Sequence, residues 1–194
     1  MQLSSRTGAI NEINADLVVV GRFSSGGASV EEITLDNAFN GQIGATAERM
    51  LFKGKARQKV GLDSAGRVSA QRVLLLGLGE KDKVTPAILR DFGAAAIDEA
   101  LAGRLSTVAI RCPLDDEQSM IQVALGAQLA TYRFTDLMAE PEEGPRPEVK
   151  ELQLLGTASE AALSQAERIA EGVNLARTLI NEPANICTPE RMAE

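Results

Sequence analysis

The stretch that decides the fold reads RVLLLGL over residues 72–78 and, after a short connection, TPAILRDFGAAAIDEAL over residues 85–101. The first part is a continuous apolar run closed by glycine, which is typical of a buried strand. The second begins with Thr85-Pro86, a threonine suited to the N-cap followed by a proline suited to the first helical position. Its apolar residues then recur at helical spacing: Ile88, Leu89, Phe92, Ala96 and Ile97. A strand followed by an amphipathic helix predicts a layered α/β fold.

The same alternation continues outward through most of the chain. We expect strands at residues 17–20, 57–62, 107–112 and 149–155, and helices at residues 33–50, 115–132 and 159–180. The short turn at residues 63–66 predicts an antiparallel hairpin between strands 57–62 and 72–78. The charged, proline-rich residues 140–147 are expected to form a surface loop. The predicted fold is therefore a three-layer α/β/α domain with a mixed sheet.

The longest predicted helix, residues 159–180, is followed by a clear break. Its apolar stripe is expected to lie on a core and consists of Leu163, Ala166, Ala170, Val173, Ala176 and Ile180. Pro183 cannot continue the helix. Thr188-Pro189-Glu190 then predicts the start of a new helix, and the sequence stops about one turn later. We expect the chain to be the front piece of something longer.

Composition limits the classes of function that the chain can have. At 194 residues and 44% hydrophobic, the chain can form one domain plus an appendage. A net charge of −7 repels nucleic acid and anionic lipid, and the one dense basic cluster is Lys53, Lys55, Arg57 and Lys59. The apolar runs are too short to span a bilayer, and residues 1–16 lack a signal peptide. We therefore expect a cytoplasmic protein in which Cys112 and Cys187 are unpaired and reduced.

The residue types that catalysis needs are largely missing. The sequence contains no histidine, which excludes Ser-His-Asp and Cys-His catalysis and imidazole metal ligands. Gly77-Leu78-Gly79 follows a strand, but the third glycine of a dinucleotide-binding fingerprint would fall at Asp82, and no helix begins before Thr85. We interpret these glycines as a tight exit from the strand.

The remaining motifs have structural explanations. Phe52-Lys53-Gly54-Lys55 lacks the preceding glycine and strand of a P-loop. Residues 115–117 are three acids that suit a helix start, and Glu140, Glu142 and Glu143 lie in a proline-rich loop unsuited to catalysis. Cys187 has no general base, and residues 132–134 fit a packing and capping role. We predict no catalytic, cofactor-binding or metal-binding residue.

Several stretches together resemble one enzyme family. NLARTLINEPAN at residues 174–185, followed by Thr188-Pro189-Glu190, resembles the segment that joins the two domains of cytosol (leucyl) aminopeptidases. FKGK at residues 52–55, VLLLGLG at residues 73–79 and ATYRF at residues 130–134 are similar to the same family in order and spacing.

The resemblance implies that this chain is the non-catalytic amino-terminal domain of a leucyl aminopeptidase. Residues 1–157 would form that α/β domain, similar to macro domains, residues 158–187 a linker helix and joining segment, and residues 188–194 the start of a truncated catalytic domain. The parent would be a hexameric exopeptidase that releases amino-terminal residues, preferably leucine. Its two divalent metal ions (zinc, manganese or magnesium) and its peptide substrate would bind the missing domain, which would be this domain's partner.

Two other functions stay open at the level of the sequence. One is a macro-like pocket for ADP-ribose or another nucleotide, suggested by Gly26, Gly27, Gly77 and Gly79. The other is DNA binding by a regulatory domain through residues 53–59, although the net charge makes a nucleic-acid partner the weaker expectation.

Overall fold

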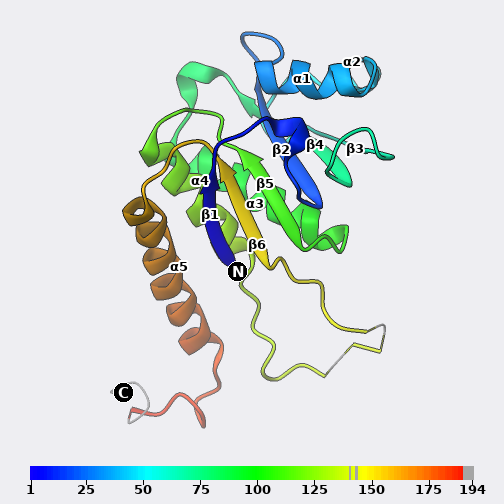
Figure 1. Cartoon of the computed structure of the whole chain (residues 1–194). Helices are drawn as coiled ribbons and strands as arrows, with labels where there is room; N and C mark the ends of the chain where they lie inside the picture. Colours follow the sequence, from blue (N-terminus) through cyan, green and yellow to red (C-terminus); the bar gives the residue numbers. More distant parts are fainter. Residues whose placement is uncertain (140, 143, 190–194) are drawn as a thin grey trace.

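The structure, a computed structural model, describes residues 1–139, 141–142 and 144–189. Over these residues one sheet lies between two layers of helices (Figure 1). Its strands are β1 (Gln2–Arg6), β2 (Leu17–Phe23), β3 (Lys59–Asp63), β4 (Arg72–Gly79), β5 (Thr107–Arg111) and β6 (Glu151–Leu155). The α-helices are α1 (Val30–Ala38), α2 (Gln42–Arg49), α3 (Pro86–Ala102), α4 (Glu117–Ala130) and α5 (Glu160–Asn181), and the 3-10 helices are η1 (Ile10–Glu12) and η2 (Lys81–Lys83).

The sheet is mixed, as predicted. Its strand order is β1-β6-β5-β2-β4-β3. Neighbours are parallel except for β3 and β4, which form the expected antiparallel hairpin with Lys59 opposite Leu76 and Asp63 opposite Arg72. Among the described strands only β3 is antiparallel, and it lies at the edge of the sheet. The four central strands, β6, β5, β2 and β4, contribute side chains to cores on both faces.

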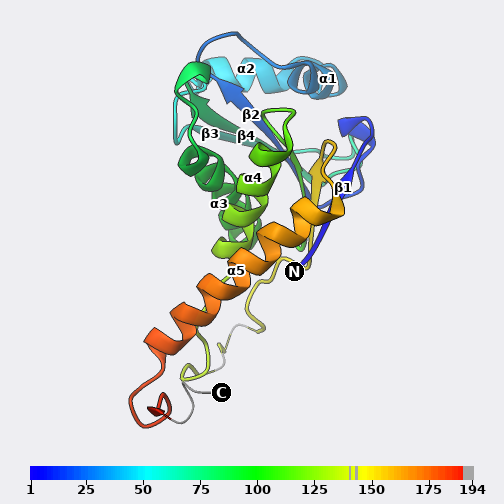
Figure 2. The same cartoon turned by 90° about the vertical axis from the view of Figure 1, so that its left-hand side faces the viewer.

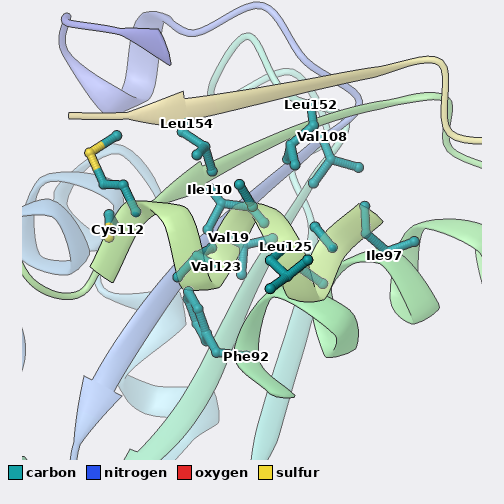
Figure 3. Close-up of a cluster of buried hydrophobic side chains, with 14 of the residues drawn as sticks. Val19, Phe92, Ile97, Val108, Ile110, Cys112, Val123, Leu125, Leu152 and Leu154 are labelled. Atoms are coloured by element: carbon teal, nitrogen blue, oxygen red, sulfur yellow. The ribbon is translucent and has the colours of Figure 1, made fainter. Parts of the chain in front are cut away.

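Side chains that alternate along the strands enter two separate cores. Leu17 and Val19 pack with α3, α4 and α5, whereas Val18 and Val20 pack with α1, α2 and η1. This two-sided burial explains why residues 17–20 read as a continuous apolar run. Figure 3 shows the larger core, in which Phe92 of α3 and Val123 of α4 lie beneath Val19 and Ile110 of the sheet. The three-layer prediction is confirmed.

The prediction of one helix over residues 33–50 is wrong. The chain forms α1 from Val30 and α2 from Gln42, separated by Asn40 and Gly41 with φ of 52° and 78°. These left-handed residues reverse the chain, and Asp36 Oδ1 accepts a hydrogen bond from the Gly44 amide of 3.0 Å at the start of α2. The break lets both helices turn their apolar residues into the same core.

Sequence reasoning missed the first strand altogether. β1 has the sequence QLSSR, with one apolar residue and no alternation that marks a strand. It forms because it adds in parallel to the edge of β6, with Gln2 opposite Glu151 and Arg6 opposite Leu155. Pairing across some 150 residues leaves no local signal in the sequence.

The apolar stripe of α5 lies on the core along only half its length. Leu163, Ala166 and Ala170 are buried, but Val173 is 38% exposed and Ile180 is 83% exposed. Figure 2 shows the reason, because the second half of α5 extends past the sheet and its helices. The expectation that the whole stripe lies on a core was therefore wrong. The helix predicted from Thr188 falls largely on residues 190–194, outside the described part of the chain.

Asp16 fastens the amino-terminal ends of three central strands. Its Oδ2 accepts hydrogen bonds from the amide and hydroxyl of Ser106, at 2.8 and 3.0 Å, and from the Thr107 amide, at 2.8 Å. Its Oδ1 accepts a bond of 2.6 Å from Gln71 Nε2. Burial alone would raise the pKa of the Asp16 carboxyl, but the bonds from Ser106 and Thr107 outweigh it, so that pKa lies below its usual range.

We expect Asp16→Ala to lower the free energy of unfolding by about 2–4 kcal/mol, because charge-assisted hydrogen bonds are lost and their donors are left unpaired. Because the pKa of Asp16 is lowered in the folded state, its contribution should be complete above about pH 4 and be lost as the pH falls through the folded pKa. Urea unfolding between pH 2.5 and 7 measures both effects. Asp63→Asn, at a carboxylate 85% exposed, is the control and should change stability by less than about 0.5 kcal/mol. Equal effects of the two substitutions would contradict this role.

Candidate functional site

The strand order creates one place where an α/β fold would bind a ligand. β2 leads to α1 and α2 on one face of the sheet, whereas the next strand in space, β5, leads to α4 on the other face. A crevice outside the carboxyl ends of such strands is the usual ligand site of open α/β sheets. Here it holds a hollow of about 280 Å³, lined by the glycine-rich loop 24–29 and by residues 111–113. A neighbouring hollow of about 340 Å³ lies at the ends of β1 and β6.

Internal ion pairs occupy the two arginines of this crevice, whereas Lys81, which also lines it, lies over the Phe23 ring at 5.9 Å. Arg22 donates from Nε to Glu32 Oε2 at 2.9 Å and makes a second contact with the other carboxylate oxygen. Arg111 donates from Nε to Glu31 Oε1 at 2.7 Å and contacts Asp115 at 2.8 Å. Two carboxylates from the first turn of α1 thus neutralise the two arginines that a phosphate group would need.

The protonation state of Glu31 favours its pairing with Arg111. Burial alone would raise the pKa of the Glu31 carboxyl, but hydrogen bonding at the start of α1 and the Arg111 guanidinium outweigh it and lower that pKa. The Glu31 carboxylate is therefore charged at neutral pH. A nucleotide would have to displace Glu31 and Glu32 from the two arginines, so these arginines give no support to the ADP-ribose alternative.

The four glycines of that alternative do not gather at one site. Gly26 and Gly27 have φ of 112° and 75° and line the crevice. Gly77 and Gly79 do not line it. A Cβ on Gly77 would lie 2.0 Å from the Lys55 carbonyl oxygen, so this glycine lets a loop cross the end of β4 closely. The interpretation as a tight strand exit agrees with this geometry.

The two cysteines are free and have no catalytic surroundings. Cys112 is buried beside the crevice, and burial raises the pKa of its thiol to about 11. It therefore stays protonated at neutral pH, whereas a nucleophilic cysteine needs a thiolate. Cys187 is partly exposed in the segment after α5.

Two of the three acids at residues 115–117, Asp116 and Glu117, accept hydrogen bonds at the starts of helices. Asp116 accepts bonds from the amide and hydroxyl of Ser119, at 2.8 and 2.6 Å, which lower the pKa of its carboxyl. Glu117 accepts a bond of 2.9 Å from the Ser159 amide just before α5. Over residues 1–139, 141–142 and 144–189, no three His, Cys, Asp or Glu side chains gather closely enough to hold a metal ion.

The basic segment at residues 53–59 forms a loop across the ends of β2 and β4. Lys59 is neutralised by Glu99, with Nζ and Oε2 2.9 Å apart. Lys53, Lys55 and Arg57 are exposed and make no ion pair within the described part of the chain. Three cations on one loop are too few for an extended nucleic-acid surface.

A polar cluster holds the second half of α5 against the end of α4. The hydroxyl of Tyr132 lies 3.2 Å from Thr178 Oγ1 and accepts a bond of 3.2 Å from Asn181 Nδ2. The Arg177 guanidinium stacks 5.6 Å from the Tyr132 ring and donates to the Leu129 carbonyl at 2.9 Å, which caps α4. The predicted packing and capping role of Tyr132 agrees with this. The cluster fixes the direction in which α5 leaves the domain.

Comparison with known proteins gives consistent matches. The family model described as "cytosol aminopeptidase family, N-terminal domain" matches residues 19–141. Probable cytosol aminopeptidases of Nitrosococcus oceani and Bordetella avium are 34% and 30% identical, over 91% and 100% of this chain. These matches cover 38% and 41% of the relatives, so the chain spans about two fifths of their length. Among the described residues, no helix is long and apolar enough to cross a membrane.

Solved structures also match this chain. A tomato leucine aminopeptidase mutant superposes over the whole chain with a TM-score of 0.86 at 25% identity, and the match covers 40% of that protein. The bottromycin maturation enzyme BotP matches 92% of this chain and 35% of its own, with a TM-score of 0.70 at 26% identity. A further BotP structure is described as a complex with Mn.

Proposed function

The chain belongs to the cytosol aminopeptidase family as its amino-terminal domain, and we propose that it is the non-catalytic part of a cytoplasmic metalloaminopeptidase. The parent enzyme would release amino-terminal residues, leucine preferred, from peptides that bind the other domain. Two divalent metal ions, zinc, manganese or magnesium, would lie in that domain, and the parent would assemble as a hexamer. The match to an amino-terminal domain model, over two fifths of the relatives' length, supports this most strongly.

The absence of chemistry within the described residues supports the same proposal. The two arginines of the candidate crevice are paired with Glu32 and Glu31, and the described residues offer no cluster for a metal ion. We assign no catalytic, cofactor-binding or metal-binding residue to this chain. Its contribution would be structural, through the surface that it offers to the catalytic domain.

The second half of α5 is the part suited to that contact. Residues 1–157 would form the domain, residues 158–187 the linker helix and joining segment, and residues 188–194 the start of the catalytic domain. Val173, Ala176 and Ile180 continue the stripe that is buried up to Ala170, yet they are exposed. We call these three residues the α5 ridge. The polar cluster around Tyr132 holds the ridge rigid, so that it can bind a partner without first being ordered.

The α5 ridge can be tested in the longer parent protein. We expect Val173→Asp and Ile180→Asp each to weaken docking of the catalytic domain by about 3 kcal/mol or more, because each would bury an uncompensated carboxylate. The parent would lose aminopeptidase activity, and its proposed hexamer would dissociate to the same extent. In the 194-residue chain the same substitutions should change stability by less than about 0.5 kcal/mol, since both sites are exposed there.

Leu175→Asp is the matched control. Leu175 is 61% exposed and lies on the opposite side of α5, about 200° around the helix from Val173 at 100° per residue. Activity and assembly of the parent should survive this change. A parent that tolerates both ridge substitutions would refute the proposed role of α5.

A further inference from the structure

A second concave surface lies away from the crevice. It is a slot of about 300 Å³ between α3 and the loop that precedes β3. Leu76 and Phe92, 5% and 4% exposed, form part of its lining, with Ile88 and Ala95 half-buried beside them. The lining is therefore mainly apolar, which suits an apolar side chain rather than a phosphate group.

The loop that forms one wall of the slot is held in place. Oε1 of Gln58 accepts bonds from the amides of Lys53 and Lys55 at 2.9 and 3.0 Å, and its Nε2 donates to the Leu51 carbonyl at 3.1 Å. Gly77 donates to the Gln58 carbonyl at 2.8 Å, which ties the loop to β4. The slot is thus largely formed before anything binds, and little conformational entropy would be lost on binding.

The two walls of the slot carry opposite charge. Arg57 and Lys59 line the loop side, and Arg57 makes no ion pair with any described residue. Asp91 lines the α3 side. A segment that fits must therefore bring an apolar side chain for the lining and a carboxylate on the loop side, away from Asp91.

This chain itself displays such a segment. The turn at residues 135–138 is closed by a bond of 2.9 Å from the Met138 amide to the Thr135 carbonyl. Leu137 at its tip is 63% exposed and Met138 is 60% exposed, next to the exposed Asp136. Large apolar side chains that stand out from a preformed turn beside an acid are complementary to the slot in both hydrophobicity and charge.

We propose that the turn at residues 135–138 of one copy binds the slot of a second copy, with Leu137 on the apolar lining and Asp136 beside Arg57. The contact is heterologous, because it joins two different surfaces. It involves one turn and one slot, so it is weak and depends on protein concentration. It uses only residues of this chain, and it holds or fails independently of the proposed aminopeptidase function.

Sedimentation equilibrium of the purified 194-residue chain, over a range of concentrations at low salt, tests this contact. We expect reversible association that Arg57→Glu and Asp136→Arg each weaken at least about tenfold, because each places like charges together. A mixture of these two variants should associate again, since the unmodified turn of Arg57→Glu fits the unmodified slot of Asp136→Arg and the two reversed surfaces also fit each other. Leu137→Ala should weaken association without affecting the fold.

Two matched controls separate the contact from general effects of charge and hydrophobicity. Lys53→Glu makes the same charge change on the same loop outside the slot, and Leu175→Ala removes a leucine that is 61% exposed elsewhere. Both should associate like the unmodified chain. A chain that stays monomeric at all concentrations, a mixture that does not recover, or a Lys53→Glu effect equal to that of Arg57→Glu would overturn the proposal.

Discussion

Gly126→Ala is expected to destabilise the domain by about 3 kcal/mol or more, although alanine is the better helix former. A Cβ at Gly126 in α4 would lie 2.0 Å from the Arg90 carbonyl oxygen and 2.5 Å from the Arg90 Cα in α3. Gly93 in α3 meets α4 in the same way, with a Cβ position 2.1 Å from the Val123 carbonyl oxygen. Backbone atoms cannot rotate away, so the two helices would have to separate and open the core beneath them.

Gly172→Ala is expected to have the opposite effect on stability, although Gly172 also lies inside a helix. Gly172 lies inside α5, and no neighbouring atom comes within 4 Å of its Cβ position. Without a steric conflict, alanine should raise the free energy of unfolding by about 0.5–1 kcal/mol through helix propensity and a less flexible unfolded chain. Urea midpoints of both variants, compared at unchanged m-value, measure the pair. If Gly126→Ala were as stable as the unmodified chain, the close crossing of α3 and α4 would be wrong.

Local signals explain which elements could be predicted from the sequence. The strand at residues 72–78 and the helix from Thr85 each carry their own pattern, and the structure places β4 at Arg72–Gly79 and α3 at Pro86–Ala102. The break between α1 and α2 was missed because Phe39, Ile43 and Ala47 keep helical spacing across Asn40 and Gly41. The reversal changes the backbone but not the spacing of the residues that enter the core.

The geometry of the crevice could not be predicted because its contacts are distant in sequence. Arg111 and Glu31 are 80 residues apart, and Arg22 pairs with a carboxylate in the first turn of α1. The sequence shows that Arg22 and Arg111 each lie near the end of a predicted strand, and that acids follow a glycine-rich loop. It does not show that these arginines and acids neutralise one another. The exposure of the second half of α5 could not be predicted for a similar reason. Periodicity indicates an apolar face of a helix, but not whether another part of the protein covers that face.

We propose that this chain supplies structure to an aminopeptidase and none of its chemistry. The most direct measurement is hydrolysis of leucine p-nitroanilide with manganese, by the 194-residue chain and by the proposed longer parent protein at equal concentration. We predict turnover by the parent and none above background by the chain alone. Turnover by the chain that survives repurification and scales with its concentration would contradict the account.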